Sequence, residues 1–189
     1  AMDVYAFDPR VSALTPRSRR FLDELGVWRA IAGYRSCAYR HMTVWDAEGT
    51  GQIEFDRSDV DASELGHIVE NRAIVRPLVQ CLLAAPDITV FNPRKVQSCE
   101  RQGDTGHVLT LDDGAQLRAP LVVAADGALS PLRSMAGFAT REWDYGHSAI
   151  VATVQHERDH QHTAWQRFLP SGPLALLPLP GDGSGQGPG

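Results

Sequence analysis

The sequence has little cysteine. Only Cys37, Cys81 and Cys99 occur in 189 residues, far apart and without a CxxC pair. This excludes a disulfide framework, because such frameworks need an even set of closely spaced cysteines. A reducing compartment, the cytoplasm, is therefore expected.

Long apolar runs and excess positive charge are also absent. No apolar stretch approaches the roughly 20 residues that a membrane-spanning helix needs, and the start lacks the pattern of a secretion signal. We therefore expect a protein that is soluble or at most peripheral to a membrane. With 18 basic and 23 acidic residues the net charge is −5, so no concentrated basic surface points to nucleic acid.

What the sequence does contain is enough apolar material, 43% of residues, to build a core. Apolar spacing predicts a helix over residues 15–32 with a break at Gly26, and a second helix over residues 68–84. Alternation between these helices predicts a hairpin with strands near residues 42–44 and 53–55.

The second half of the sequence has the pattern of strands. A β-meander is expected from strands over 88–91, 95–100, 107–111 and 116–118. The apolar run 121–125 predicts a strand buried on both faces. Ser130 and Pro131 then begin a helix, and further strands are predicted at 147–156, 163–169 and 174–179.

Three histidines, His156, His160 and His162, lie close together in the sequence HERDHQH. Imidazole is a frequent zinc ligand. A polar turn between two strands explains this segment better, so the sequence analysis predicts no metal site.

Several blocks carry a family resemblance, and their order and spacing agree as well as their content. They are FDPRVSALTP, LGHIVENRAIVRPL, LVVAADGALSPLR and WDYGHSAIVATV, the last followed by WQRFLPSGPLALLPLP. Over residues 7–180 the sequence resembles the flavin monooxygenases that hydroxylate the ring of ubiquinone precursors, a branch of the para-hydroxybenzoate hydroxylase-like fold.

The resemblance implies a mixed α/β (α+β) fold. Residues 1–136 would form a partial FAD-binding domain that contains the β-meander and a hairpin insertion at about 39–62. Residues 137–180 would supply part of an antiparallel substrate-domain sheet, and the glycine-rich residues 181–189 would be a tail.

The resemblance also implies cofactor contacts, and it names no catalytic residue. The implied cofactor-binding residues are Arg10, Asn71, Arg72, Val96, Asp126 and Gly127. All of these except Val96 have a simpler reading from the residues alone, which for Arg72 is a solvated surface side chain. Arg10 would form a surface salt bridge, Asn71 would cap a helix, and Asp126-Gly127 would be an ordinary turn.

Two family features are missing from these residues. The sequence contains no GxGxxG turn, which in such families brings backbone amides to the FAD pyrophosphate, and no second GD motif with its helix. We therefore expect an internal fragment with weak or absent FAD binding.

The resemblance further implies NAD(P)H as co-substrate and a prenylated phenol or quinol as substrate. We expect a homo-oligomer in the cytoplasm, with peripheral inner-membrane association as a further expectation. A non-enzymatic binding or assembly module for a prenylated ring or a biosynthetic complex is the alternative.

Overall fold

The computed structural model describes residues 8–103 and 106–180. Contacts divide the chain into two compact units, one made of residues up to 88 and from 150 onward, the other of residues 89–149. The predicted mixed α/β class is confirmed. The domain boundary expected near residue 136 stays a prediction.

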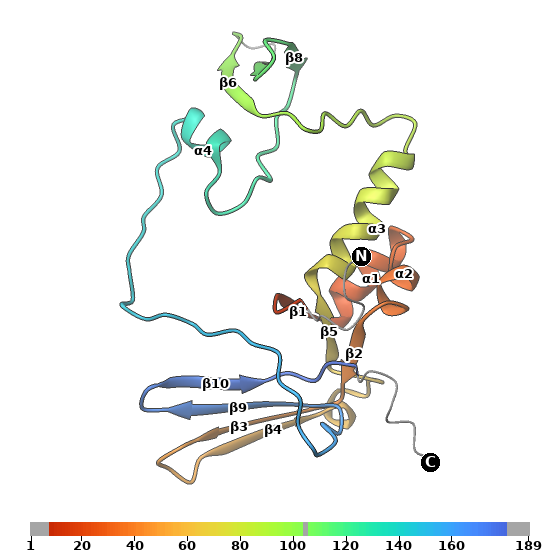
Figure 1. The fold of residues 1–189 in the computed structure, drawn as a ribbon, viewed down its shortest axis with the longest axis vertical. Coiled ribbons are helices and arrows are strands. Elements are labelled where there is room, and N and C mark those ends of the chain that lie inside the picture. The colour runs from red at the N-terminus through yellow and green to blue at the C-terminus, as the bar shows by residue number, and fades with distance from the viewer. Residues whose placement is uncertain (1–7, 104–105, 181–189) are drawn as a thin grey trace. The chain divides into compact units, whose positions relative to one another are not determined.

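The first unit contains helices and two sheets (Figure 1). Its elements in chain order are β1 (Val11–Leu14), α1 (Pro16–Glu24), α2 (Trp28–Ala32), β2 (Ser36–Tyr39), β3 (His41–Asp46), β4 (Gln52–Asp56), the 3-10 helix η1 (Arg57–Val60), β5 (Gly66–Glu70), α3 (Asn71–Ala84), β9 (Thr163–Leu169) and β10 (Gly172–Leu176).

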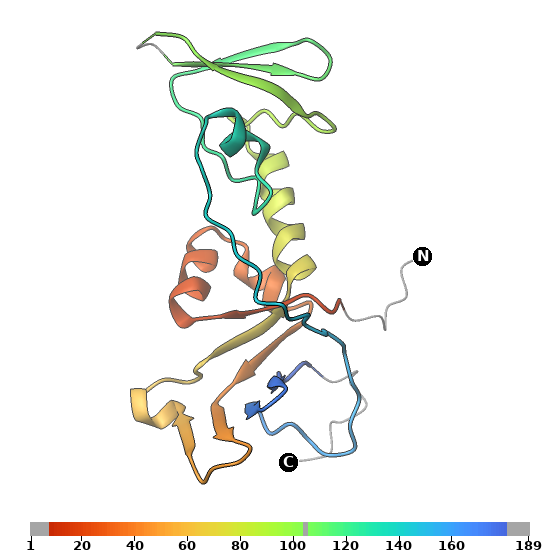
Figure 2. The same ribbon diagram turned by 90° about the vertical axis from the view of Figure 1, so that its left-hand side faces the viewer.

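A three-stranded sheet in the order β1-β5-β2 packs with the helices α1, α2 and α3. Both neighbours of β5 run antiparallel to it. In Figure 2 the red and orange helices α1 and α2 lie beside the start of the yellow helix α3. Their shared core is made of Leu22, Val27, Trp28, Ile31, Val69 and Ala73.

The predicted helix over 15–32 is divided as expected. Thr15 caps α1 by accepting a hydrogen bond from the Ser18 amide at 3.2 Å. Gly26 then takes a left-handed backbone conformation with φ +74°, which separates α1 from α2.

The second sheet has the order β10-β9-β3-β4. The predicted hairpin is confirmed by the antiparallel pairing of β3 with β4, and β9 pairs antiparallel with β10. The parallel pairing of β9 with β3 was not predicted, and it joins the hairpin to the late strands.

The second unit is the meander and one short helix. Strands β6 (Val96–Arg101), β7 (His107–Leu111) and β8 (Gln116–Ala119) form an antiparallel sheet, and α4 (Pro131–Met135) follows. The meander is therefore confirmed from β6 onward. The strand expected at residues 88–91 is wrong, since this segment has no regular structure.

Two other strand predictions are wrong. Residues 121–125 are not a strand, and Leu121 and Val123 are about three-quarters exposed, at 73% and 74%. Residues 147–156 are not a strand either. In both segments an apolar pattern is present, but no described strand pairs with it, and a strand requires such a partner.

The second predicted helix begins three residues later than expected. Ile68, Val69 and Glu70 complete β5 instead. Ile68 and Val69 pair with both β1 and β2, and Glu70 pairs with Val11 of β1. No helix among the described residues is long and apolar enough to cross a membrane.

Candidate functional site

The junction of β5 and α3 gathers charged side chains around Glu70. This last residue of β5 is fully buried. Its carboxylate accepts hydrogen bonds from Arg72 Nε at 2.6 Å, Arg35 Nη1 at 3.1 Å and the Asp8 amide at 3.1 Å. A buried carboxylate is tolerated when it is paired and hydrogen-bonded in this way.

Three predicted cofactor-binding residues lie at this junction. Asn71 donates its amide to the Arg10 carbonyl at 2.9 Å, and Arg72 directly follows Asn71. The structure therefore brings Arg10, Asn71 and Arg72 together where β1 meets the start of α3.

The simpler reading of Asn71 as a helix cap is wrong. The capping position belongs to Glu70, whose side chain makes no capping bond. The Asn71 side chain instead accepts a hydrogen bond from Ser12 Oγ at 2.7 Å, which fixes it against β1.

The start of α3 favours an anionic ligand. The N-cap residue Glu70 makes no side-chain capping bond to this 14-residue helix, and the positive end of a helix dipole favours a negative group. Arg10 is exposed beside it. Arg72 and Arg35 also lie over the Tyr34 ring, at 5.9 and 5.7 Å from its centroid.

Phosphate groups of a dinucleotide suit this donor set, because guanidinium groups and helix amides are their usual partners. Glu70 offsets part of the positive charge and also holds Arg72 in place. The residues at the β5–α3 junction therefore fit a cofactor such as FAD.

The other predicted residues lie in the second unit. Asp126 and Gly127 form a turn before α4, and Gly127 has φ +87°, which favours glycine. The Asp126 carboxylate accepts hydrogen bonds from the Ser130 hydroxyl and, at 3.2 Å, from the Leu132 amide. Chiefly because of the Ser130 bond, the pKa of Asp126 lies below its usual range.

Asp126 thus has a structural task within its own turn. Ser130 in addition accepts a hydrogen bond from the Arg133 amide at 3.0 Å, which caps α4.

Val96 is the first residue of β6, pairs with Leu111 and lies at a register shift in the strand. Asp126, Gly127 and Val96 were predicted through the resemblance and stay predictions, whereas Glu70 was not predicted. Its signal in the sequence is an acidic residue that directly follows the apolar pair Ile68 and Val69.

Comparison with protein families identifies a match over nearly the whole chain. Residues 2–180 match the family described as FAD binding domain. The chain belongs to this FAD-binding domain family.

The names of the curated relatives of this FAD-binding domain refer to ubiquinol or ubiquinone chemistry. The chain is 38% identical over 172 residues to the 3-demethoxyubiquinol 3-hydroxylase of Escherichia coli, covering 91% of the chain and 44% of that protein. It is 38% identical over 182 residues to the mitochondrial ubiquinone biosynthesis monooxygenase COQ6 of Mus musculus, covering 92% and 38%. The chain thus spans less than half the length of these relatives.

Solved structures share the fold of this FAD-binding domain. Klebsiella pneumoniae HpxO, complexed with FAD and uric acid, matches with a TM-score of 0.61 at 17% identity, over 90% of this chain and 44% of that chain. Pseudomonas aeruginosa PqsL, in complex with 2-aminobenzoylacetate, matches with a TM-score of 0.62 at 18% identity, over 72% and 37%.

Proposed function

We propose that this chain is part of an FAD-dependent monooxygenase that hydroxylates the ring of a prenylated phenol or quinol. The observation that carries the proposal is the 38% identity over 172 residues to 3-demethoxyubiquinol 3-hydroxylase. The family match over residues 2–180 supports the cofactor.

FAD, when bound, supplies the redox chemistry by which NAD(P)H and dioxygen hydroxylate an aromatic ring. In the proposed site, Arg10 and Arg72 oppose the negative charge of the cofactor, and the amides at the start of α3 add donors. Glu70 keeps Arg72 oriented through its 2.6 Å ion pair.

In the second unit, Gly127 allows a tight turn and Asp126 holds that turn through Ser130. The proposed contact of Val96 is through its backbone amide and carbonyl. The residues named here bind and orient, and none is assigned to proton transfer.

A segment exchange tests the function. Residues 8–180 of this chain replace the matching segment in the E. coli 3-demethoxyubiquinol 3-hydroxylase, and NAD(P)H-dependent formation of the hydroxylated quinol is measured. We expect a yellow chimera that forms product. A folded, flavin-loaded chimera that forms no product would contradict the substrate class, and a folded chimera without flavin would contradict the cofactor.

The matched controls are chimeras that carry Arg10→Ala or Arg94→Ala. Both arginines are exposed, and Arg94 pairs with Asp113 at 2.6 Å within the second unit. We expect weaker flavin retention only with Arg10→Ala.

One observation favours the alternative of a binding or assembly module. Large apolar side chains are widely exposed, among them Leu129 at 90% and Ile150 at 95%, which suits a protein partner. We further propose a cytoplasmic protein with peripheral membrane association, since a prenylated substrate partitions into lipid.

A further inference from the structure

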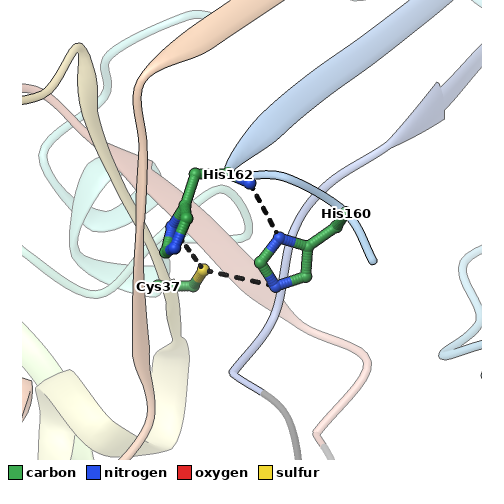
Figure 3. A group of neighbouring side chains, drawn as sticks. All are labelled: Cys37, His160 and His162. Atoms are coloured by element: carbon green, nitrogen blue, oxygen red, sulfur yellow. Dashed lines mark hydrogen bonds between the residues drawn. The ribbon is translucent and has the colours of Figure 1, made fainter. Parts of the chain in front are cut away.

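Apart from the proposed cofactor contacts, the first unit brings a cysteine and two histidines together (Figure 3). Cys37 lies on β2, and His160 and His162 lie in the turn that precedes β9. Cys37 Sγ is 3.9 Å from His160 Nε2 and 3.9 Å from His162 Nδ1. One ligand atom from each residue lies within 4.8 Å of the others.

We propose that Cys37, His160 and His162 bind a divalent cation of borderline softness, of which Zn²⁺ is the type. Thiolate and imidazole are the donors that such ions prefer. Zn–S bonds of about 2.3 Å and Zn–N bonds of about 2.0 Å separate sulfur from nitrogen by roughly 3.5 Å in a tetrahedral site. The distance of 3.9 Å between Cys37 Sγ and His160 Nε2 needs only a small contraction.

The turn that carries the histidines has an unusual backbone. Gln161 and His162 are consecutive non-glycine residues in the left-handed region, with φ 51° and 53°, which side-chain sterics disfavour. Such conformations persist where surrounding contacts enforce them, and they concentrate at functional sites. Here the Asp159 carboxylate accepts the Gln161 amide at 2.5 Å, and the His162 carbonyl accepts the Arg40 amide at 2.8 Å.

These contacts fix the turn to the chain that follows β2. The strained conformation therefore presents both imidazoles to the strand that carries Cys37. Burial raises the pKa of the Cys37 thiol to about 11, and the charges of Arg40 and Asp159 act on it with opposite signs.

The contacts of His162 match those of a metal ligand. Its Nδ1 donates to the Ala38 carbonyl at 2.7 Å, since a carbonyl can only accept. The lone pair is then on Nε2, which is the atom that would bind the cation, and the contact of Cys37 Sγ at 3.9 Å is with the protonated Nδ1. Imidazoles that bind metals commonly donate their other N–H to a backbone carbonyl, which fixes the tautomer.

Cation binding displaces one proton and involves no change in oxidation state. The Cys37 thiol releases its proton to solvent as the metal–sulfur bond forms. His160 Nδ1 accepts the His162 amide at 3.0 Å, so the proton on His160 is at Nε2. That proton moves to Nδ1 when Nε2 binds the cation, and the bond from the amide is given up.

The bound cation would fasten two distant parts of the sequence. Cys37 and His160 are 123 positions apart, so the metal would join β2 to the start of β9. Three protein ligands leave the fourth position of a tetrahedral ion to water.

Spectroscopy of the full chain tests the site. After treatment with a chelator, the protein is titrated with Co²⁺ and then with Zn²⁺. We expect one equivalent of Co²⁺ to produce a thiolate-to-cobalt charge-transfer band, which Zn²⁺ then abolishes. Zn²⁺ should also raise the midpoint of thermal unfolding. A wild-type protein without the charge-transfer band overturns the proposal.

Variants locate the ligands. Cys37→Ser and His162→Gln should weaken Co²⁺ binding by more than the roughly 10–100-fold that loss of an outer-shell partner costs. The controls Cys81→Ser and His156→Gln should leave it unchanged. A band that persists in Cys37→Ser, or disappears in Cys81→Ser, overturns the proposal. If circular dichroism shows that Cys37→Ser does not fold, His162→Gln decides the question by the same measurement.

Discussion

At the residue scale, Glu70 is the side chain on which the β5–α3 junction depends. It is fully buried and paired with Arg35 and Arg72. Glu70→Ala should lower the free energy of unfolding by about 3–5 kcal/mol, because it leaves two partly buried guanidinium groups without their carboxylate. Urea denaturation measures this loss.

A surface pair provides the comparison. Asp113→Asn breaks the exposed pair with Arg94, and exposed pairs contribute about 0–1 kcal/mol. Equal losses for Glu70→Ala and Asp113→Asn would contradict the structural role of Glu70.

His67 gives the stability of the protein a dependence on pH. Its ring contacts Trp28 edge-on, with centroids 4.9 Å apart. Burial lowers the pKa of His67 below its ordinary value of 6.5, Glu64 opposes this shift and Arg19 adds to it. The unfolded chain therefore binds a proton at a pH where the folded chain does not.

Consequently the free energy of unfolding should fall as the pH drops through 6.5 and toward the lower pKa of the folded state. His67→Gln should flatten this fall, measured as the change in urea midpoint between about pH 7.5 and about pH 5.5. The exposed residue His147 is the control. If His147→Gln flattens the profile as much as His67→Gln, the assignment to His67 is wrong.

At the scale of elements, β5 needs a glycine where it passes between β1 and β2. A Cβ atom at Gly66 would lie 2.5 Å from the Leu14 carbonyl oxygen and 2.9 Å from the Tyr39 ring. Because the first contact is backbone, Gly66→Ala should destabilise the protein by about 1–3 kcal/mol. Gly51→Ala, with nothing within 4 Å of the added Cβ, should be nearly neutral in the same thermal unfolding assay.

Elements with strong local signals could be predicted from the sequence. Strand β7 was predicted with its observed bounds, since glycine-containing turns flank its alternating residues. Residues 121–125 show the limit of such reasoning. Their apolar run favours burial on both faces. Whether the run forms a strand depends on a pairing partner from another part of the chain, which the run itself does not reveal.

The candidate site was predictable to a similar extent. The order of the sequence blocks predicts Arg10 and Arg72 as cofactor contacts, and this stays a prediction, while the fold places both at the β5–α3 junction. The approach of Cys37 to His160 was not predictable, because their sequence separation of 123 hides any spacing pattern. Only the pairing of β3 with β9 brings them together.

At the scale of the whole molecule, exposed apolar side chains favour association. Leu129 and Ile150 are almost fully exposed, and such surface usually mediates contacts. We expect a homo-oligomer by multi-angle light scattering, with Leu129→Glu and Ile150→Glu shifting the mass toward the monomer. Val60→Glu, at an exposed position on η1, is the control. A monomer at high micromolar concentration would contradict this prediction.

Flavin affinity is the second property of the whole chain. Since these 189 residues contain no GxGxxG turn, we expect an FAD dissociation constant above about 1 µM, equivalent to less than about 8.2 kcal/mol of binding free energy. Arg10→Ala should weaken binding at least about tenfold, the cost of one charge-assisted hydrogen bond. Calorimetric titration measures both values. Submicromolar, stoichiometric binding would contradict the first expectation.

The parallel pairing of β3 with β9 affects the order of events during synthesis. Strand β3 leaves the ribosome roughly 120 residues before its partner strand β9, about 6–24 seconds at usual elongation rates. Throughout that interval one edge of β3 has no strand beside it. Nascent chains are therefore open to pairing with one another, or to capture by a chaperone, until residues 163–169 emerge.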